Sequence, residues 1–297
     1  MLLNDLEEKK LLNSYPKFMI SNTHYLTIMG SIAYGVSEDT SDFDIYGFCI
    51  PPKENIFPHL SGVIPGFGRQ INRFEQFQQH HIHDKDALGG KGREYDISVY
   101  SIIKYFQLCM ENNPNMLDSL FTPHNCILHI TNIGNRIREN RKIFLHKGSY
   151  FKHKGYAYSQ QAKMVSQKRE GGRREIVEKY GYDIKFAYHC IRLLNQAEQI
   201  LLEHDLDLQK NNEQLKSIRR GEWTLEEIKE YFTMKERQLE ELYSKSDLRH
   251  SPDEESIKNL LLSCLEEHYG SLDKAIERPD KYKDLIFQIK NLVENIN

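Results

Sequence analysis

Polar and hydrophobic residues alternate in the first third of the chain and recur at helical spacing in the rest. Two strands are expected at about residues 24–29 and 43–51, joined by a glycine turn and a short helical piece. A third strand-like segment covers about residues 71–82, and a fourth begins near Tyr95 and passes into a helix at Ser101. Four short strands and their connections therefore predict a small sheet in this part of the chain.

Helical periodicity dominates from about residue 125 onward. It starts with hydrophobic residues spaced three to seven apart, namely Ile127, Ile130, Ile133, Ile137 and Phe144. Further helices are expected at about residues 150–168, 183–203, 222–244, 256–268 and 280–294. Asn113-Pro114 and Asp183 are typical helix starts, and Thr224 with Glu227 three residues later predicts a capping box. The second half therefore reads as all-helical.

A Gly-Ser turn and an Asp-x-Asp pair stand close together where the first two strands are joined. Gly30-Ser31 ends the first strand, and Asp42-Phe43-Asp44 begins the second. Because residues two apart on a strand point to the same face, the two aspartates project together. Paired carboxylates bind hard cations, and a glycine turn with backbone N–H groups and a hydroxyl suits a phosphate. This favours metal-assisted phosphoryl or nucleotidyl chemistry, and the alternative is an ordinary strand–turn–strand with solvated aspartates.

The stretch resembles the nucleotidyltransferase superfamily that includes DNA polymerase beta, whose signature is a Gly-Ser turn, a spacer and Asp-x-Asp. A bacterial and phage subgroup associated with RNA repair, the YcgL-like proteins, is similar to the chain at YDISVYSIIKYFQLCMENNPNMLDSLF, REIVEKYGYDIKFAYHCIRLLNQAEQIL and IRRGEWTLEEI. The resemblance covers most of the chain. It implies an α+β fold, with a nucleotidyltransferase α/β domain and small mixed sheet in residues 1–124 and an all-helical domain in residues 125–297. The active site is expected in the cleft between them.

The resemblance also implies a third carboxylate on a later strand. Asp96 is the candidate, because a carboxylate among apolar residues is costly to bury unless it is paired, hydrogen-bonded or metal-bound. Glu94 lies on the same face and competes for the role, and a local cap is the simpler alternative. In the superfamily's mechanism, Asp42, Asp44 and Asp96 hold two Mg²⁺ ions, or Mn²⁺ in their place, and a nucleoside triphosphate (NTP) is the substrate.

The helix after Asp183 carries a basic stripe. Lys185, His189 and Arg192 are spaced by four and three residues and share one face, while Ile184, Ala187, Ile191 and Leu194 form the opposite stripe. A basic face turned toward the carboxylates would neutralise a triphosphate. Tyr182 either stacks on a base or packs, and a structural role is the alternative for His189. The predicted nucleotide-binding residues are Gly30, Ser31, Lys185, His189, Arg192 and Tyr182.

Charge is distributed unevenly along a chain of 297 residues whose net charge is only −3. Residues 136–192 hold 15 Lys and Arg against 5 Asp and Glu, whereas both flanking parts are acidic. A basic block of this kind favours a phosphate-rich partner, and a solvated, salt-bridged surface is the alternative. We therefore expect an RNA 3′ end, tRNA included, as the acceptor of the nucleotide. A protein or small-molecule acceptor, and a non-catalytic NTP- or RNA-binding member, remain the other possibilities.

Further predictions concern disulfides, metal sites and cellular location. Five scattered cysteines without a CxxC pair argue against disulfides and a zinc frame, and four of them suit buried thiols. With no signal peptide and no membrane span visible, a cytoplasmic, soluble protein is expected. The segment from His80 to Gly92 holds three histidines and two aspartates, yet its spacing fits a hairpin tip better than a metal frame.

Overall fold

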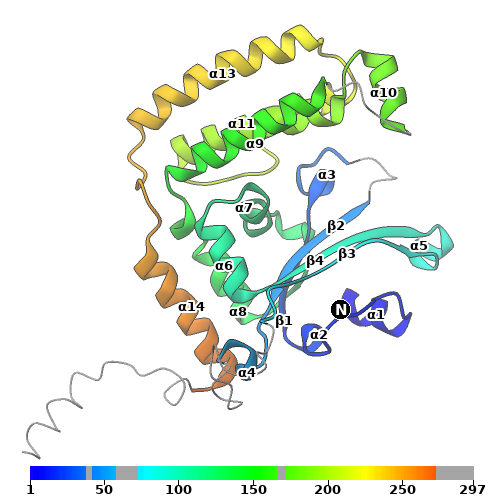
Figure 1. Ribbon diagram of the computed structural model, residues 1–297, viewed down its shortest axis with the longest axis vertical. Coiled ribbons are helices and arrows are strands. Elements are labelled where there is room, and N and C mark those ends of the chain that lie inside the picture. Colours follow the sequence, from blue (N-terminus) through cyan, green and yellow to red (C-terminus); the bar gives the residue numbers. More distant parts are fainter. Residues whose placement is uncertain (38–41, 58–72, 166–171, 272–297) are drawn as a thin grey trace, which may run out of the picture. The chain divides into compact units, whose positions relative to one another are not determined.

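The computed structural model describes residues 1–37, 42–57, 73–165 and 172–271 (Figure 1). It divides into two compact units. Unit 1 comprises Met1–Pro51 and Phe74–Leu261, and unit 2 comprises Pro52–Arg73 and Leu262–Asn297. In unit 2, Lys53 of helix α4 (Lys53–Ile56) donates a hydrogen bond of 3.0 Å to the Ser271 carbonyl. Every residue of the site described below belongs to unit 1.

A five-stranded mixed sheet forms the frame of unit 1. Its strand order is β3-β4-β2-β1-β5, in which β2 and β4 are parallel and the other neighbours antiparallel. The strands are β1 (Thr23–Ile28), β2 (Phe43–Cys49), β3 (Gln76–Asp84), β4 (Arg93–Ser101) and β5 (Ile127–Ile130). The predicted α+β class with a small mixed sheet is confirmed.

The two faces of the sheet differ in chemistry because side chains alternate along each strand. One face is apolar, where Ile45 and Ile97 pack in a core with leucines of α1 (Leu2–Glu8) and Met19 of α2 (Phe18–Ser21). Figure 1 shows these two helices together on that side of the sheet. Asp44 and Asp96 precede those isoleucines and therefore project from the opposite face.

Local capping explains how the chain leaves the sheet. The Ser101 hydroxyl accepts the Lys104 N–H and starts α6 (Ile102–Met110), and the Asn113 side chain caps α7 (Pro114–Phe121), with proline in its first turn. Both predicted helix starts are confirmed. The remaining short elements of this part are α3 (Gly30–Ala33), α5 (Ala87–Gly90), α8 (Asn132–Glu139), η2 (His124–Cys126) and η3 (Arg141–Phe144).

The expectation of a helix from residue 127 was wrong at its start. Ile127–Ile130 is strand β5, an edge strand that pairs with β1, and the helix begins only after Thr131, whose hydroxyl accepts the Gly134 N–H. The isoleucines at 127, 130, 133 and 137 keep a helix-like spacing, although the first two lie in a strand and the last two in a helix. A strand of four residues is too short to show an alternation of its own, so the sequence pattern could not distinguish it from the helix that follows.

Three long helices lie side by side in the second half of the chain (Figure 1). They are α9 (Gly148–Met164), α11 (Ile184–Glu203) and α13 (Leu225–Lys245), which share an apolar core that includes Ala157, Leu194 and Phe232. The Asp183 cap and the Thr224–Glu227 capping box are confirmed. The other helices are α10 (Gly172–Tyr180), α12 (Asn212–Arg219) and α14 (Glu254–Tyr269).

The structure tests the predictions for the cysteines and for membrane spans, but not those for the last helix and the domain boundary. All five cysteines are buried and unlinked by disulfides. Among the described residues, no helix has both the length and the apolar character needed to cross a bilayer. The helix expected at residues 280–294 lies outside the described part of the chain. The domain boundary after residue 124 stays a prediction, and β5 and α8, which follow it, both contact strand β1.

Candidate active site

Two acidic residues lie side by side at one end of the parallel strand pair, and a third comes just before one of the strands. In the register of β2 and β4, Asp44 lies directly opposite Asp96, and neighbouring strands are about 4.8 Å apart. Asp42 comes two residues before Asp44, just ahead of β2, and is exposed. The sequence predicts Asp44 and Asp96 on two strands, and the strand pairing brings these two side by side.

The Gly30 turn is packed onto this acidic group. Gly30 has a φ of +65°, which favours glycine, and a Cβ at this position would collide with the Asp44 carboxylate. The Met29 N–H also donates to the Asp44 carbonyl at 2.6 Å, which holds the end of β1 against β2. Ser31 follows in α3, and its carbonyl accepts the Val36 N–H at 2.9 Å. The turn and the carboxylates therefore form one local structure.

Electrostatics make the acidic group a natural cation site. Burial, then the neighbouring charges of Asp96 and Asp42, raise the pKa of Asp44 to about 6, while His80 opposes the shift. A carboxylate crowded in this way is relieved when a cation lies between it and its neighbours. Carboxylate oxygens are the donors that Mg²⁺ and Mn²⁺ prefer, so these residues fit the divalent ions that the sequence implied.

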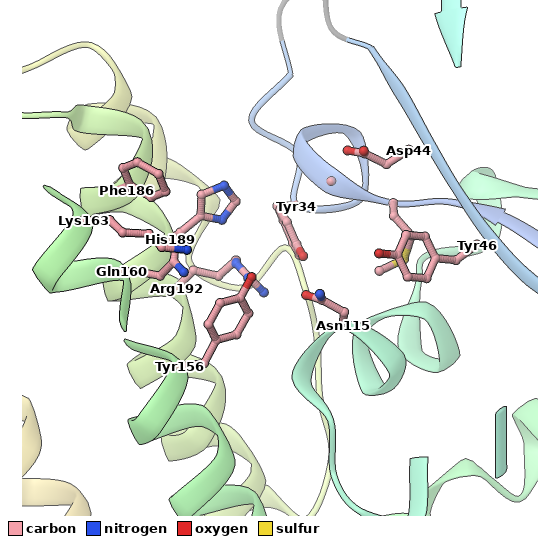
Figure 2. Close-up of a pocket in the computed structure, with 12 residues that line it drawn as sticks. Tyr34, Asp44, Tyr46, Asn115, Tyr156, Gln160, Lys163, Phe186, His189 and Arg192 are labelled. Atoms are coloured by element: carbon pink, nitrogen blue, oxygen red, sulfur yellow. The ribbon is translucent and has the colours of Figure 1, made fainter. Parts of the chain in front are cut away.

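A pocket of about 280 Å³ opens beside Asp44. Figure 2 shows Asp44, Tyr46 and Asn115 on one side of it, and side chains from α9 and α11 on the other. The second wall is formed by Tyr156, Gln160, Lys163, Phe186, His189 and Arg192. One wall, here called the acidic wall, thus carries the Asp44 carboxylate, and the opposite wall carries the basic groups of Lys163, His189 and Arg192.

Arg192 is held firmly in its wall. Its side chain is only 4% exposed, and its Nη1 donates to Asp118 and to Gln196, at 2.5 and 2.8 Å. Tyr34 donates to the same Asp118 carboxylate at 2.7 Å, and the Arg192 guanidinium lies over the Tyr34 ring. This buried network ties α7 and α11 to the residue that follows the Gly30 turn. Arg192 therefore shapes the pocket, and much of its charge is already balanced by Asp118.

The other predicted nucleotide-binding residues fall into two groups. His189 lines the pocket beside Arg192. Lys185 is exposed and does not belong to the pocket lining. Tyr182 is buried and donates its hydroxyl to the Trp223 carbonyl at 2.6 Å, so it takes the packing role.

Several pocket residues were missed at the sequence level. Tyr46 could have been found, since it continues the alternation of Asp42 and Asp44 on one strand face. Asn115 lies in the first turn of α7, where the sequence predicts only a helix start at Asn113-Pro114. Tyr156, Gln160 and Lys163 come from α9, and their direction depends on how α9 packs against α11. No local pattern in the sequence carries that information.

Two comparisons with known proteins gave matches. A family model described as RlaP, the RNA repair pathway DNA polymerase beta family, matches residues 6–282. Among solved structures, a nucleotidyltransferase-like protein from Exiguobacterium sibiricum matches with a TM-score of 0.29 at 10% identity, over 93% of this chain and 80% of that one. No curated protein sequence matches. The family match spans nearly the whole chain and supports a nucleotidyltransferase of the polymerase beta type. The chain belongs to the RNA repair pathway DNA polymerase beta family.

Proposed function

We propose that the protein transfers a nucleoside monophosphate from an NTP to an acceptor hydroxyl, with Mg²⁺ bound by Asp42, Asp44 and Asp96. The observation that supports this most is the register of β2 and β4, in which Asp44 and Asp96 are direct neighbours beside the Gly30 turn. Asp96 is preferred over Glu94 as the third carboxylate because Asp96 lies opposite Asp44 itself.

The triphosphate is assigned to the space between the two walls of the pocket. Gly30 lines the pocket at the acidic wall, and Ser31, which is not among the lining residues, follows it in α3. The backbone N–H groups of this turn are assigned to the phosphates, and His189 and Lys163 present basic groups at the other wall. Arg192 contributes at the same wall from its fixed position. Lys163 replaces Lys185 in the proposed site, and Tyr182 is left out of it.

The reaction is an in-line displacement at the α-phosphorus. When bound, the Mg²⁺ ions would lower the pKa of the acceptor hydroxyl and neutralise charge on the phosphates. The acceptor oxygen forms its bond to the α-phosphorus as the bond to pyrophosphate breaks. The chain's own contribution is to hold the carboxylates, the turn and the basic wall in fixed positions before the substrate arrives.

An RNA 3′ end is the proposed acceptor, tRNA included. The family description associates its members with RNA repair, and residues 136–192 carry an excess of basic residues. However, several of these basic side chains already bind other groups of the protein. Arg138 is buried and donates to the Thr122 carbonyl at 2.6 Å, and Lys154 pairs with Glu236 at 2.8 Å. The RNA assignment therefore rests more on the family than on the charge count.

Labelling distinguishes the acceptors directly. Each α-labelled NTP is incubated with the protein, Mg²⁺ and total cellular RNA, alongside reactions without RNA and without metal. Label on RNA that requires both metal and protein supports the proposed function. Label on protein or on a small molecule would replace the RNA acceptor by the alternatives, and no label with any NTP would leave a non-catalytic binding protein.

A further inference from the structure

A β-bulge in strand β3 faces the acidic site. Gln79 pairs with Ile97 and Ile82 pairs with Tyr95, so two residues of β3, His80 and His81, lie opposite Asp96 alone. In a regular strand, adjacent side chains point to opposite faces. A bulge breaks this alternation and re-aims side chains.

Both imidazoles consequently approach the carboxylates of β4. His80 Nδ1 is 3.4 Å from an Asp96 oxygen, and His81 Nδ1 is 2.5 Å from a Glu94 oxygen. The His81 backbone N–H also donates to Asp96 at 2.7 Å. His83 lies opposite Glu94 in the register, with its Nδ1 3.6 Å from the second Glu94 oxygen. Three histidines thus surround two carboxylates on one face.

The spacing of these groups suits a small divalent ion. Potential ligand atoms of His81, Glu94 and Asp96 all lie within 4.8 Å of one another. A tetrahedral ion with ligands about 2.0–2.2 Å away holds them about 3.3–3.6 Å apart, so only small side-chain rotations are needed. The His81 side chain is 76% exposed and can rotate.

The donor type separates this cluster from the magnesium site. Imidazole nitrogen suits Zn²⁺ and related transition metals, whereas Mg²⁺ prefers oxygen ligands and retains its water. Asp42 and Asp44 offer only oxygen, while the bulge places nitrogen and oxygen donors together. The two clusters share one residue, Asp96.

We propose that His81, Glu94 and Asp96 form a binding site for a zinc-class divalent ion, with His80 and His83 within reach as further ligands. Because an Asp96 oxygen that binds zinc is withdrawn from the magnesium site, zinc at this position inhibits nucleotidyl transfer. The proposal of a zinc site depends only on the geometry of the cluster, whereas the proposed inhibition by zinc rests on the proposed function.

Zinc binding is measured first, without nucleotide, by competition of the full chain with a chromogenic zinc chelator. His81→Ala removes one ligand yet keeps the backbone N–H that donates to Asp96, and His124→Ala changes an exposed histidine elsewhere. His81→Ala is expected to weaken zinc binding at least ~10-fold, the loss that even outer partners of metal ligands cause, while His124→Ala binds as the unchanged protein does. Equal affinity in all three proteins would overturn the site. Glu94→Gln, expected to weaken binding to a similar extent, is the second variant if His81→Ala does not fold.

Inhibition is measured next, at fixed Mg²⁺, with each rate normalised to the same protein without zinc. Zinc is expected to slow transfer by the unchanged protein and by His124→Ala, and to spare His81→Ala. Zinc that binds through His81 and leaves transfer unaffected would refute the inhibitory role. If no protein transfers nucleotide at all, the failure lies with the proposed function, and the chelator result still decides the metal site.

Discussion

Asp44 is the residue at which stability and the proposed activity oppose each other most clearly. It is packed against Gly30 and next to two other carboxylates, and its pKa is raised to about 6. Each unit of such a shift corresponds to about 1.4 kcal/mol of differential stability. The metal-free protein therefore carries an unfavourable charge that a bound cation would relieve.

A pH dependence follows for the protein in EDTA. A carboxyl group whose folded pKa lies above its unfolded value stabilises the fold at low pH, and this contribution is lost as pH rises through about 4 to 6. Asp44→Asn should therefore raise the midpoint of thermal unfolding at pH 7 and flatten its change between pH 4 and 6, as differential scanning calorimetry would record. An unchanged or lowered midpoint at pH 7 would show that Asp44 is not strained by its neighbours.

Gly30 offers a second test at the same scale. Gly30→Ala adds a Cβ that collides with the Asp44 carboxylate at a φ of +65°, so the variant should lose nucleotidyl transfer as Asp44 is displaced. Gly155→Ala is the matched control, because Gly155 lies in α9 with open space around its Cβ position. The control should keep its transfer rate and gain about 0.5–1 kcal/mol in free energy of unfolding. Full activity in Gly30→Ala would contradict the close packing of turn and carboxylate.

The positions of Gly30, Asp42 and Asp44 could be predicted from the sequence, because each depends only on residues nearby in the chain. Asp42 and Asp44 share a face through strand alternation, and Gly30 is marked by its place after a strand. Asp96 was placed by resemblance, and the parallel register then put it opposite Asp44. The histidines at 80, 81 and 83 stand out in the sequence, but they lie in strand β3 and not at the predicted hairpin tip. Their approach to Glu94 and Asp96 could not be predicted, because it depends on a bulge, and a bulge has no reliable sequence pattern.

At the scale of elements, the packing of α9 against α11 decides which basic residues face the site. Of the predicted stripe Lys185, His189 and Arg192 on α11, His189 and Arg192 line the pocket. The neighbouring helix nevertheless contributes Lys163 to the pocket, and Lys185 stays outside it. Helix caps at Ser101, Asp183 and Thr224 were readable, since each is made within four residues of chain. The orientation of α9 against α11 could not be predicted, because it depends on contacts between residues that are far apart in the sequence.

Two lysine variants test this orientation. Lys163→Ala should raise KM for the NTP about tenfold or more, because a charge-assisted contact to phosphate contributes about 1.5–3 kcal/mol. Lys185→Ala removes the same charge from an exposed position outside the pocket and should change KM less than about twofold, within the ordinary effect of a surface substitution. Steady-state kinetics with the preferred NTP measures both. A larger effect at Lys185 than at Lys163 would restore the original helix-face assignment.

For the molecule as a whole, the number of basic residues in the 136–192 block is larger than the number of positive charges that could bind RNA. Among the described residues of the 136–192 block, Arg138 and Arg192 are buried, Lys142 pairs with Asp205 at 2.6 Å, and Lys154 pairs with Glu236. Sequence reveals a charge count, whereas pairing and burial depend on the folded chain. The salt-bridged alternative thus accounts for part of the block.

The salt dependence of RNA binding should reflect this reduced set of charges. If about four cations contact phosphates of a single strand, the logarithm of the binding constant should fall with a slope of about −3 against the logarithm of salt concentration. Fluorescence anisotropy with a labelled RNA between 50 and 200 mM salt gives the slope. A slope near −10 would mean that most of the 15 basic residues engage RNA, and a slope of zero would exclude an electrostatic interface.

The transfer rate of Asp44→Asn measures whether Asp44 and its neighbours form the metal site proposed for nucleotidyl transfer. The rate of label transfer from an α-labelled NTP is measured at saturating Mg²⁺ for the unchanged protein, for Asp44→Asn and for Asp86→Asn, which alters an exposed aspartate in the β3–β4 hairpin. Loss of a metal ligand removes several kcal/mol of transition-state stabilisation, so Asp44→Asn should be slower by at least about 100-fold. Asp86→Asn should match the unchanged protein. Transfer by Asp44→Asn at the unchanged rate would mean that Asp44 is not a ligand of a catalytic metal ion.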